Sequence, residues 1–197
     1  IIKGKMFKLF RKDNFLDDFW KNLQILKDLN SLNESKINIL GKSGLLISAH
    51  KKNDFTRNIK VNMQSVLSEG DSSTGTSIEL IEDSSDMYWL ILKDIEEYDL
   101  LSSSYTALNA LYANDSLQNI LALVFKFEFI IKNSEKVIIF LIYRIDLKSF
   151  YPFMPISQNP KSRNKEIEIL FSNYLSKNKI KIETTQKNWL GVWGIPF

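Results

Sequence analysis

Ile-Leu-Ala-Leu-Val-Phe-Lys-Phe-Glu-Phe-Ile-Ile (residues 120–131) and Val-Ile-Ile-Phe-Leu-Ile-Tyr-Arg-Ile (residues 137–145) are the stretches that decide the fold. Each is apolar on both faces of an extended chain, which is typical of strands covered on both sides in the middle of a sheet. The polar residues 133–136 (Asn-Ser-Glu-Lys) form a natural connection between them. The sequence therefore predicts that these two strands form the centre of the sheet.

Around this pair, the spacing of apolar residues predicts helices and further strands. The helices are expected over residues 14–29, over residues 55–67, between Asp94 and Asn114, and after Ser162. The strands are expected at residues 37–40, 45–47, 77–81, 87–92 and 180–183. Antiparallel pairs alternate with helices, so the fold class is α+β, with an antiparallel sheet of hairpins and helices packed on it. The alternation also suggests two similar halves.

The composition predicts one globular domain over residues 1–197. Apolar residues make up 44% of the chain and charged residues 25%, with a net charge of +3. This charge is too slight to indicate nucleic-acid binding. The chain has no cysteine, which excludes disulfides, thiol nucleophiles and thiolate metal sites. We expect neither a cofactor nor a metal. Apolar runs of about seven residues are far shorter than the roughly twenty that span a bilayer.

Two short stretches invite a catalytic interpretation, and both have a simpler one. Gly41-Lys42-Ser43 resembles part of a phosphate-binding loop, but Lys36 stands where the motif requires a glycine. We expect a hairpin turn there instead. His50 is the only histidine, and two lysines follow it, which disfavours a protonated ring or a bound metal. We expect it at the surface.

The first twelve residues can be interpreted as an amphipathic segment at a membrane surface. Phe7 and Phe10 alternate with Lys8 and Arg11, so the rings could enter the headgroup boundary while the cations face anionic lipids. The alternative is a flexible end that packs one ring on the body of the protein. Both interpretations stay open on sequence alone.

Aromatic residues and prolines gather in residues 150–155 and in the ending Trp-Leu-Gly-Val-Trp-Gly-Ile-Pro-Phe (189–197). Pro152 and Pro155 predict an irregular segment. Aromatic rings beside cations suit either a protein partner or stacked bases, and weak nucleic-acid binding stays a third hypothesis. The expected partner-binding residues are Tyr151, Phe153, Arg163, Glu166, Trp189 and Trp193. In the alternative, these rings close one end of the sheet and the tryptophans pack back on them.

A second hypothesis is a ligand-binding protein or an enzyme with an arginine and glutamate pocket. Arginine can hold a carboxylate or a phosphate in bidentate fashion. The residues that would form this pocket are Arg144, Arg163, Glu166 and Glu168.

Over residues 76–197 the chain resembles the bacterial and archaeal PspA-associated protein family PspAB. The resemblance rests on residues 86–94 (Asp-Met-Tyr-Trp-Leu-Ile-Leu-Lys-Asp), on Tyr-Pro-Phe-Met-Pro (151–155) followed by Arg163 and Glu166, and on Trp-Gly-Ile-Pro-Phe (193–197). It implies a non-enzymatic accessory protein of a PspA-type envelope stress response, in the cytoplasm or at the inner face of the membrane, with PspA as a possible protein partner. It implies no catalytic residues. The element order also resembles the secretion-chaperone fold, which is an analogy of fold alone.

Overall fold

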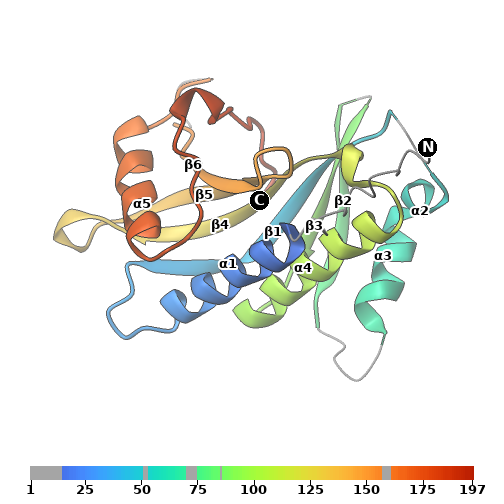
Figure 1. Cartoon of the computed structure of the whole chain (residues 1–197), viewed down its shortest axis with the longest axis horizontal. Helices are drawn as coiled ribbons and strands as arrows, with labels where there is room; N and C mark the ends of the chain where they lie inside the picture. Colours follow the sequence, from blue (N-terminus) through green and yellow to red (C-terminus); the bar gives the residue numbers. More distant parts are fainter. Residues whose placement is uncertain (1–14, 51–52, 70–74, 85, 157–160) are drawn as a thin grey trace, which may run out of the picture.

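The computed structural model describes residues 15–50, 53–69, 75–84, 86–156 and 161–197. They form a six-stranded antiparallel sheet with helices packed against it (Figure 1), which confirms the α+β class. The strands are β1 (Ile37–Ser48), β2 (Ser77–Ser84), β3 (Met87–Lys93), β4 (Ile120–Ile130), β5 (Lys136–Arg144) and β6 (Ser149–Phe153), in the order β2-β3-β1-β4-β5-β6. The helices are α1 (Phe15–Asn30), α2 (Asp54–Arg57), α3 (Ile59–Ser68), α4 (Glu97–Ala113) and α5 (Lys165–Lys177), with short 3₁₀ turns η1 (Leu117–Asn119), η2 (Lys132–Ser134) and η3 (Gln186–Asn188).

The two deciding stretches form β4 and β5, which pair as the expected hairpin with Phe125 opposite Leu141. β4 lies in the middle of the sheet beside β1, whereas β5 lies next to the edge strand β6. The side chains of β4 alternate between two apolar cores, one on each face of the sheet. This double covering explains why residues 122–125 of β4 are apolar on both faces, whereas Lys126 and Glu128 follow where one face is only partly covered.

The larger core lies between the sheet and the helices. α1 and α4 lie side by side on one face, and α5 covers the end of the same face near β4, β5 and β6 (Figure 1). Phe19 of α1 packs against Tyr143 and Phe150, and Phe171 of α5 packs against Phe127 and Phe129. The amphipathic spacing of these helices therefore buries one apolar face of each, as their sequences predict.

The predicted hairpin at residues 37–47 is wrong, because β1 is one strand with an irregularity in its pairing to β4 between Ile39 and Ser43. A Cβ atom on Gly41 would overlap the carbonyl oxygen of Asp94, whose amide donates a hydrogen bond to the Gly41 carbonyl over 3.2 Å. Glycine is thus needed for a close approach of two backbones and not for a turn.

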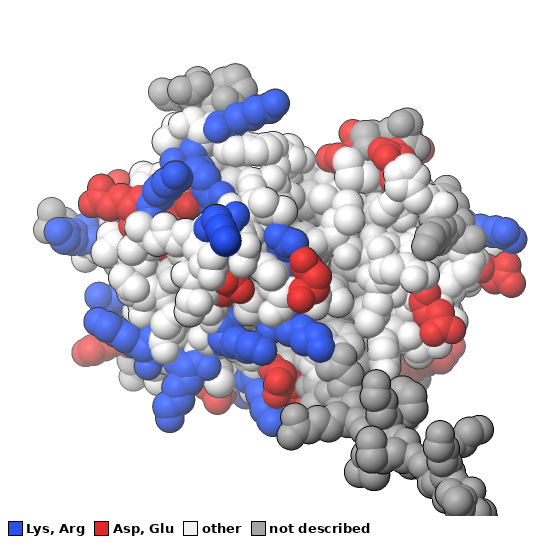
Figure 2. All heavy atoms as spheres, turned by 45° about the horizontal axis from the view of Figure 1, so that its top comes forward, with Lys and Arg blue, Asp and Glu red and all other residues white. Residues whose placement is uncertain are grey.

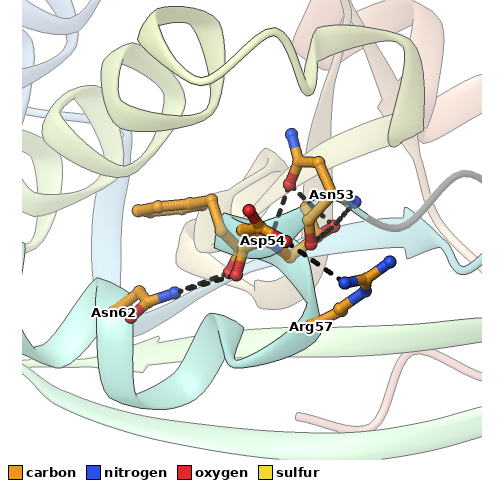
Figure 3. A network of polar contacts seen from close by, with 6 residues as sticks. Asn53, Asp54, Arg57 and Asn62 are labelled. Carbon is orange, nitrogen blue, oxygen red and sulfur yellow. Dashed lines mark hydrogen bonds and ion pairs between the residues drawn. The ribbon is translucent and has the colours of Figure 1, made fainter.

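The predicted helix over residues 55–67 is divided at Asn58 into α2 and α3. Asn53 begins α2 with a capping box: its side chain accepts a hydrogen bond from the Thr56 amide, and the Thr56 hydroxyl accepts one from the Asn53 amide. Arg57 pairs with Asp54 over 3.2 Å, and Asn62 of α3 donates to the Phe55 carbonyl over 2.9 Å (Figure 3). Polar side chains of both helices therefore stabilise the break.

The prediction that the chain is irregular from Pro152 onward is also wrong, because residues 149–153 form β6 with Pro152 inside it. β6 is an edge strand, where a missing amide hydrogen is tolerated. Asn164, and not Ser162, begins α5, and its side chain accepts a hydrogen bond from the Ile167 amide. Residues 180–183 form no full strand; they make one parallel bridge to Phe150. The likeness of two halves and the secretion-chaperone analogy stay predictions.

Candidate functional site

The face of the sheet away from the helices carries a second apolar core, which residues of the C-terminus cover. The sheet contributes Trp89, Ile91, Ala122, Val124, Phe140, Ile142, Tyr151 and Phe153. Four side chains of residues 186–197, here called the covering segment, pack on them: Trp189, Val192, Ile195 and Phe197. The sheet is thus covered by helices on one face and, over the part that holds these residues, by an irregular stretch of its own chain on the other.

The ring of Phe197 packs in the middle of this face of the sheet. It meets Trp89 and Phe140 edge to face, with centroid distances of 6.0 and 6.2 Å. Gly44 of β1 lies beneath it, and a Cβ atom there would lie 2.5 Å from Phe197 Cε1. A glycine at this position therefore leaves room for the ring. Sequence reasoning missed this contact because Gly44 was assigned to a turn.

Arg163 joins three parts of the chain at the edge of the covering segment. Its Nε donates to both carboxylate oxygens of Glu168 on α5, over 2.8 and 2.9 Å. Its Nη1 donates to the Trp189 carbonyl over 2.7 Å, and its Nη2 to the Pro152 carbonyl over 3.1 Å. The guanidinium also lies 4.9 Å from the centre of the Phe153 ring. Arg163 therefore binds α5, β6 and the covering segment together.

The environment of this cluster shifts two pKa values. Glu168 is 1% exposed, and burial raises its pKa, although the hydrogen bonds from Arg163 and from the Met154 amide pull it down. Burial raises the pKa of Tyr151 to about 12. The Tyr151 hydroxyl therefore keeps its proton over the physiological pH range.

The residues expected to bind a partner divide into buried and exposed members. Tyr151 and Phe153 are 1% and 0% exposed, so the expectation that they offer a free aromatic surface is corrected. β6 is buried along its whole length, because α5 covers one of its faces and the covering segment the other. Their rings take part in the interior contact that was the alternative interpretation. Trp193 packs edge-on against Phe153 at 5.0 Å.

The remaining members of the set lie at or near the surface. Trp189 is half-buried and its indole nitrogen donates to the Glu183 carbonyl over 2.8 Å. Trp193 is 37% exposed, and Glu166 is exposed on α5. Arg163 is half-buried, with its hydrogen bonds directed inward.

The four residues of the predicted arginine and glutamate pocket do not converge on one hollow. Arg144 pairs with Asp146 over 2.5 and 3.0 Å and donates to the Asn188 carbonyl, at a hollow of about 550 Å³. Arg163 and Glu168 line a different hollow of about 250 Å³, and Glu166 lines neither. Both arginines form ion pairs with carboxylates of the chain itself, so the prediction that these four residues form one ligand pocket is wrong.

Several further expectations concern residues away from this site. His50 is exposed, as expected, and its Nε2 lies 2.9 Å from an Asp86 carboxylate oxygen. No group of three or more histidine, aspartate or glutamate side chains in the described part of the chain is arranged to hold a metal. No helix among the described residues is long and apolar enough to cross a membrane. The membrane-surface residues Phe7, Lys8, Phe10 and Arg11 lie outside the described residues.

The fold and this site define a class of α+β protein whose antiparallel sheet is closed by its own C-terminal residues. The chain belongs to the family of PspA associated protein B, whose family model matches residues 28–197. The match begins well before residue 76, so α1 from residue 28 onward and β1 to α3 belong to the family region as well. No curated protein and no solved structure matches the chain.

Proposed function

We propose that this protein is a non-enzymatic accessory of a PspA-type envelope stress response that acts by binding a protein partner, with PspA as the first candidate. The proposed binding surface is the outer side of the covering segment and the adjoining part of α5. The proposed location is the cytoplasm, at the inner face of the membrane. Family membership supports the link to PspA. The surface is supported by the geometry of the segment.

The observation that carries the proposal is that the covering segment turns some apolar side chains inward and others outward. Val192 and Phe197 pack on the sheet, whereas Leu190 is 54% exposed and Trp193 37% exposed. The Trp193 ring is fixed by its edge contact with Phe153. A fixed, half-exposed tryptophan loses little conformational entropy when a partner covers it, and tryptophan is enriched among residues that dominate interface energies.

The polar groups of the cluster support a structural role for it. Arg163 directs its donors to Glu168, Pro152 and Trp189 of its own chain. The Glu168 carboxylate accepts bonds from Arg163 and from the Met154 amide. A substrate would have to compete with these internal hydrogen bonds. The same engagement argues against the alternative of an arginine and glutamate ligand pocket.

The test is binding of purified PspA to the full chain carrying Leu190→Ser and Trp193→Ser. We expect at least a tenfold loss of affinity, because a central tryptophan contributes more than 1.4 kcal/mol at typical interfaces. Ile95→Ser is the matched control, since Ile95 is 93% exposed and lies in the turn before α4. An unchanged unfolding midpoint shows that the fold is intact. Equal binding of PspA by the variant, the control and the unaltered protein would remove the proposal.

A further inference from the structure

A further hollow, of about 370 Å³, lies on the helical side of the molecule, away from the covering segment. It is formed by α5, the end of β4 with the turn that follows, and the residue before β1. Its lining residues are Lys36, Phe129, Ile130, Ile131, Lys132, Leu170, Asn173, Tyr174 and Lys177. Apolar side chains make its floor and walls, and lysines make its rim.

The floor of this hollow, here called the lysine-rimmed groove, is held in place by the main core. Phe129 is only 4% exposed, and its ring lies 4.9 Å from that of Phe171 and 5.9 Å from that of Tyr174. Leu170 is 41% exposed on the wall formed by α5. The apolar surface of the groove is therefore preformed and ready to receive a side chain.

The rim carries positive charge that the described residues do not neutralise. Lys36, Lys132 and Lys177 come from three separate elements and are exposed. No acidic residue lines the groove, and none of these three lysines forms an ion pair with a described residue. In Figure 2, most lysine and arginine side chains lie in the half of the view that holds α5 and the β4–β5 hairpin. An anionic group that enters the groove meets three cations at once.

We propose that the lysine-rimmed groove binds an acidic amphipathic helix of a partner protein. One apolar side chain of the helix enters between Leu170 and Tyr174, and carboxylates on the flanking turns pair with the rim lysines. A small apolar hollow with lysines around it suits one apolar side chain flanked by carboxylates, which an acidic amphipathic helix presents together. The proposal goes beyond the surface of the covering segment and does not depend on it.

The experiment measures fluorescence anisotropy of a labelled synthetic helix of 18 residues, with leucine along one face and glutamate on both flanks. The full chain is compared with a rim variant (Lys36→Gln, Lys132→Gln, Lys177→Gln) and with Leu170→Glu. The matched control has the same net charge as the rim variant (Lys21→Gln, Lys60→Gln, Lys181→Gln), and its lysines are exposed outside the groove and outside the covering segment. Loss of three exposed ion pairs predicts about tenfold weaker binding for the rim variant and less than twofold for the control.

Each other outcome overturns the proposal. Equal losses in the rim variant and the control would mean that the helix senses only overall charge. Binding that Leu170→Glu leaves unchanged would mean that no side chain enters the groove. Rim-dependent binding to phosphatidylserine vesicles, or to a single-stranded oligonucleotide, without binding of the acidic helix would assign the groove to another class of partner. The Leu190→Ser, Trp193→Ser variant should keep full affinity for the helix, so failure of one proposal is distinguishable from failure of the other.

Discussion

The contact between Gly44 and Phe197 shows that the second apolar core requires a residue without a side chain at position 44. In Gly44→Ala the new methyl group would meet the Phe197 ring and then the Trp89 ring, at 2.5 and 3.1 Å. We expect Gly44→Ala to lower the free energy of unfolding by about 1–3 kcal/mol, the usual cost of overpacking. Denaturant unfolding with a constant m-value would measure it.

Two further variants separate overpacking from other effects of replacing a glycine. In a Phe197→Ala background the closest contact is gone and only the 3.1 Å approach to Trp89 remains, so the additional cost of Gly44→Ala should fall to a fraction of its value. Gly75→Ala is the control for loss of a glycine in itself, because no atom lies within 4 Å of a Cβ built there. A cost of Gly44→Ala that is undiminished without the Phe197 ring would contradict this packing.

The pairing of Arg163 with Glu168 predicts a pH-dependent stability. Burial raises the Glu168 pKa above its ordinary value of 4.5, and Arg163 opposes this rise. In Arg163→Met the hydrogen bonds and the positive charge that lower the Glu168 pKa are lost, so the folded-state pKa of Glu168 should rise further. A raised folded-state pKa means that stability is fully present below about pH 4.5 and is lost as the pH rises through the folded-state pKa. At pH 7 we expect a cost of about 3–5 kcal/mol, and a smaller one at pH 4.

Unfolding of Arg163→Met by urea between pH 4 and pH 8 would measure this dependence. The double variant Arg163→Met, Glu168→Gln serves as the control, because its buried amide carries no charge to be stranded. Its stability should change less with pH than that of the single variant, because it lacks the titration of Glu168. A loss of the same size at pH 4 and pH 7 in the single variant would show that Arg163 acts through packing alone.

At the scale of elements, the two short helices α2 and α3 offer a matched comparison of caps. The Asn53 side chain accepts from the Thr56 amide and donates to the Asn114 carbonyl and the Ser116 hydroxyl, over 2.6 and 2.7 Å. Asn58 precedes α3 but makes no side-chain cap bond. We expect Asn53→Ala to cost about 1–2 kcal/mol and Asn58→Ala much less. Thermal unfolding of both variants tests this, and equal costs would contradict a capping role for Asn53.

The elements that could be predicted from sequence are those whose apolar spacing matches the structure they form. β4, β5 and α1 lie within a residue or two of their expected bounds, because local pattern and burial agree there. β1 and β6 differ from their predictions because the roles of Gly41 and Pro152 depend on parts of the fold that are distant in the chain. Gly41 makes room for Asp94, and Pro152 is tolerated because it lies on an edge strand. Neither neighbour is visible in the local sequence.

At the scale of the whole molecule, the sequence grouped residues that the structure brings into contact, but it did not show that they are buried. Arg163, Trp189 and Phe153 were expected to act together, and the structure brings them into contact. Their burial could not be predicted, since an apolar strand face looks the same whether a helix, a partner or the chain's own end covers it. The choice among these depends on contacts between β6 and residues more than thirty positions later, which local spacing does not encode.

The unequal covering of the sheet has a consequence for local opening. Helices with complete internal hydrogen bonding protect one face, whereas no backbone hydrogen bond joins residues 191–197 to any other residue that the structure describes. Among the described residues, the packing of apolar side chains holds that stretch, namely Val192, Trp193, Ile195 and Phe197, so it can separate from the sheet while the hydrogen bonds between the strands remain intact. Amide protons there should exchange with solvent deuterium through a low-energy fluctuation, long before those of β4. The same local opening would briefly expose the aromatic side chains of the sheet that lie beneath the covering segment.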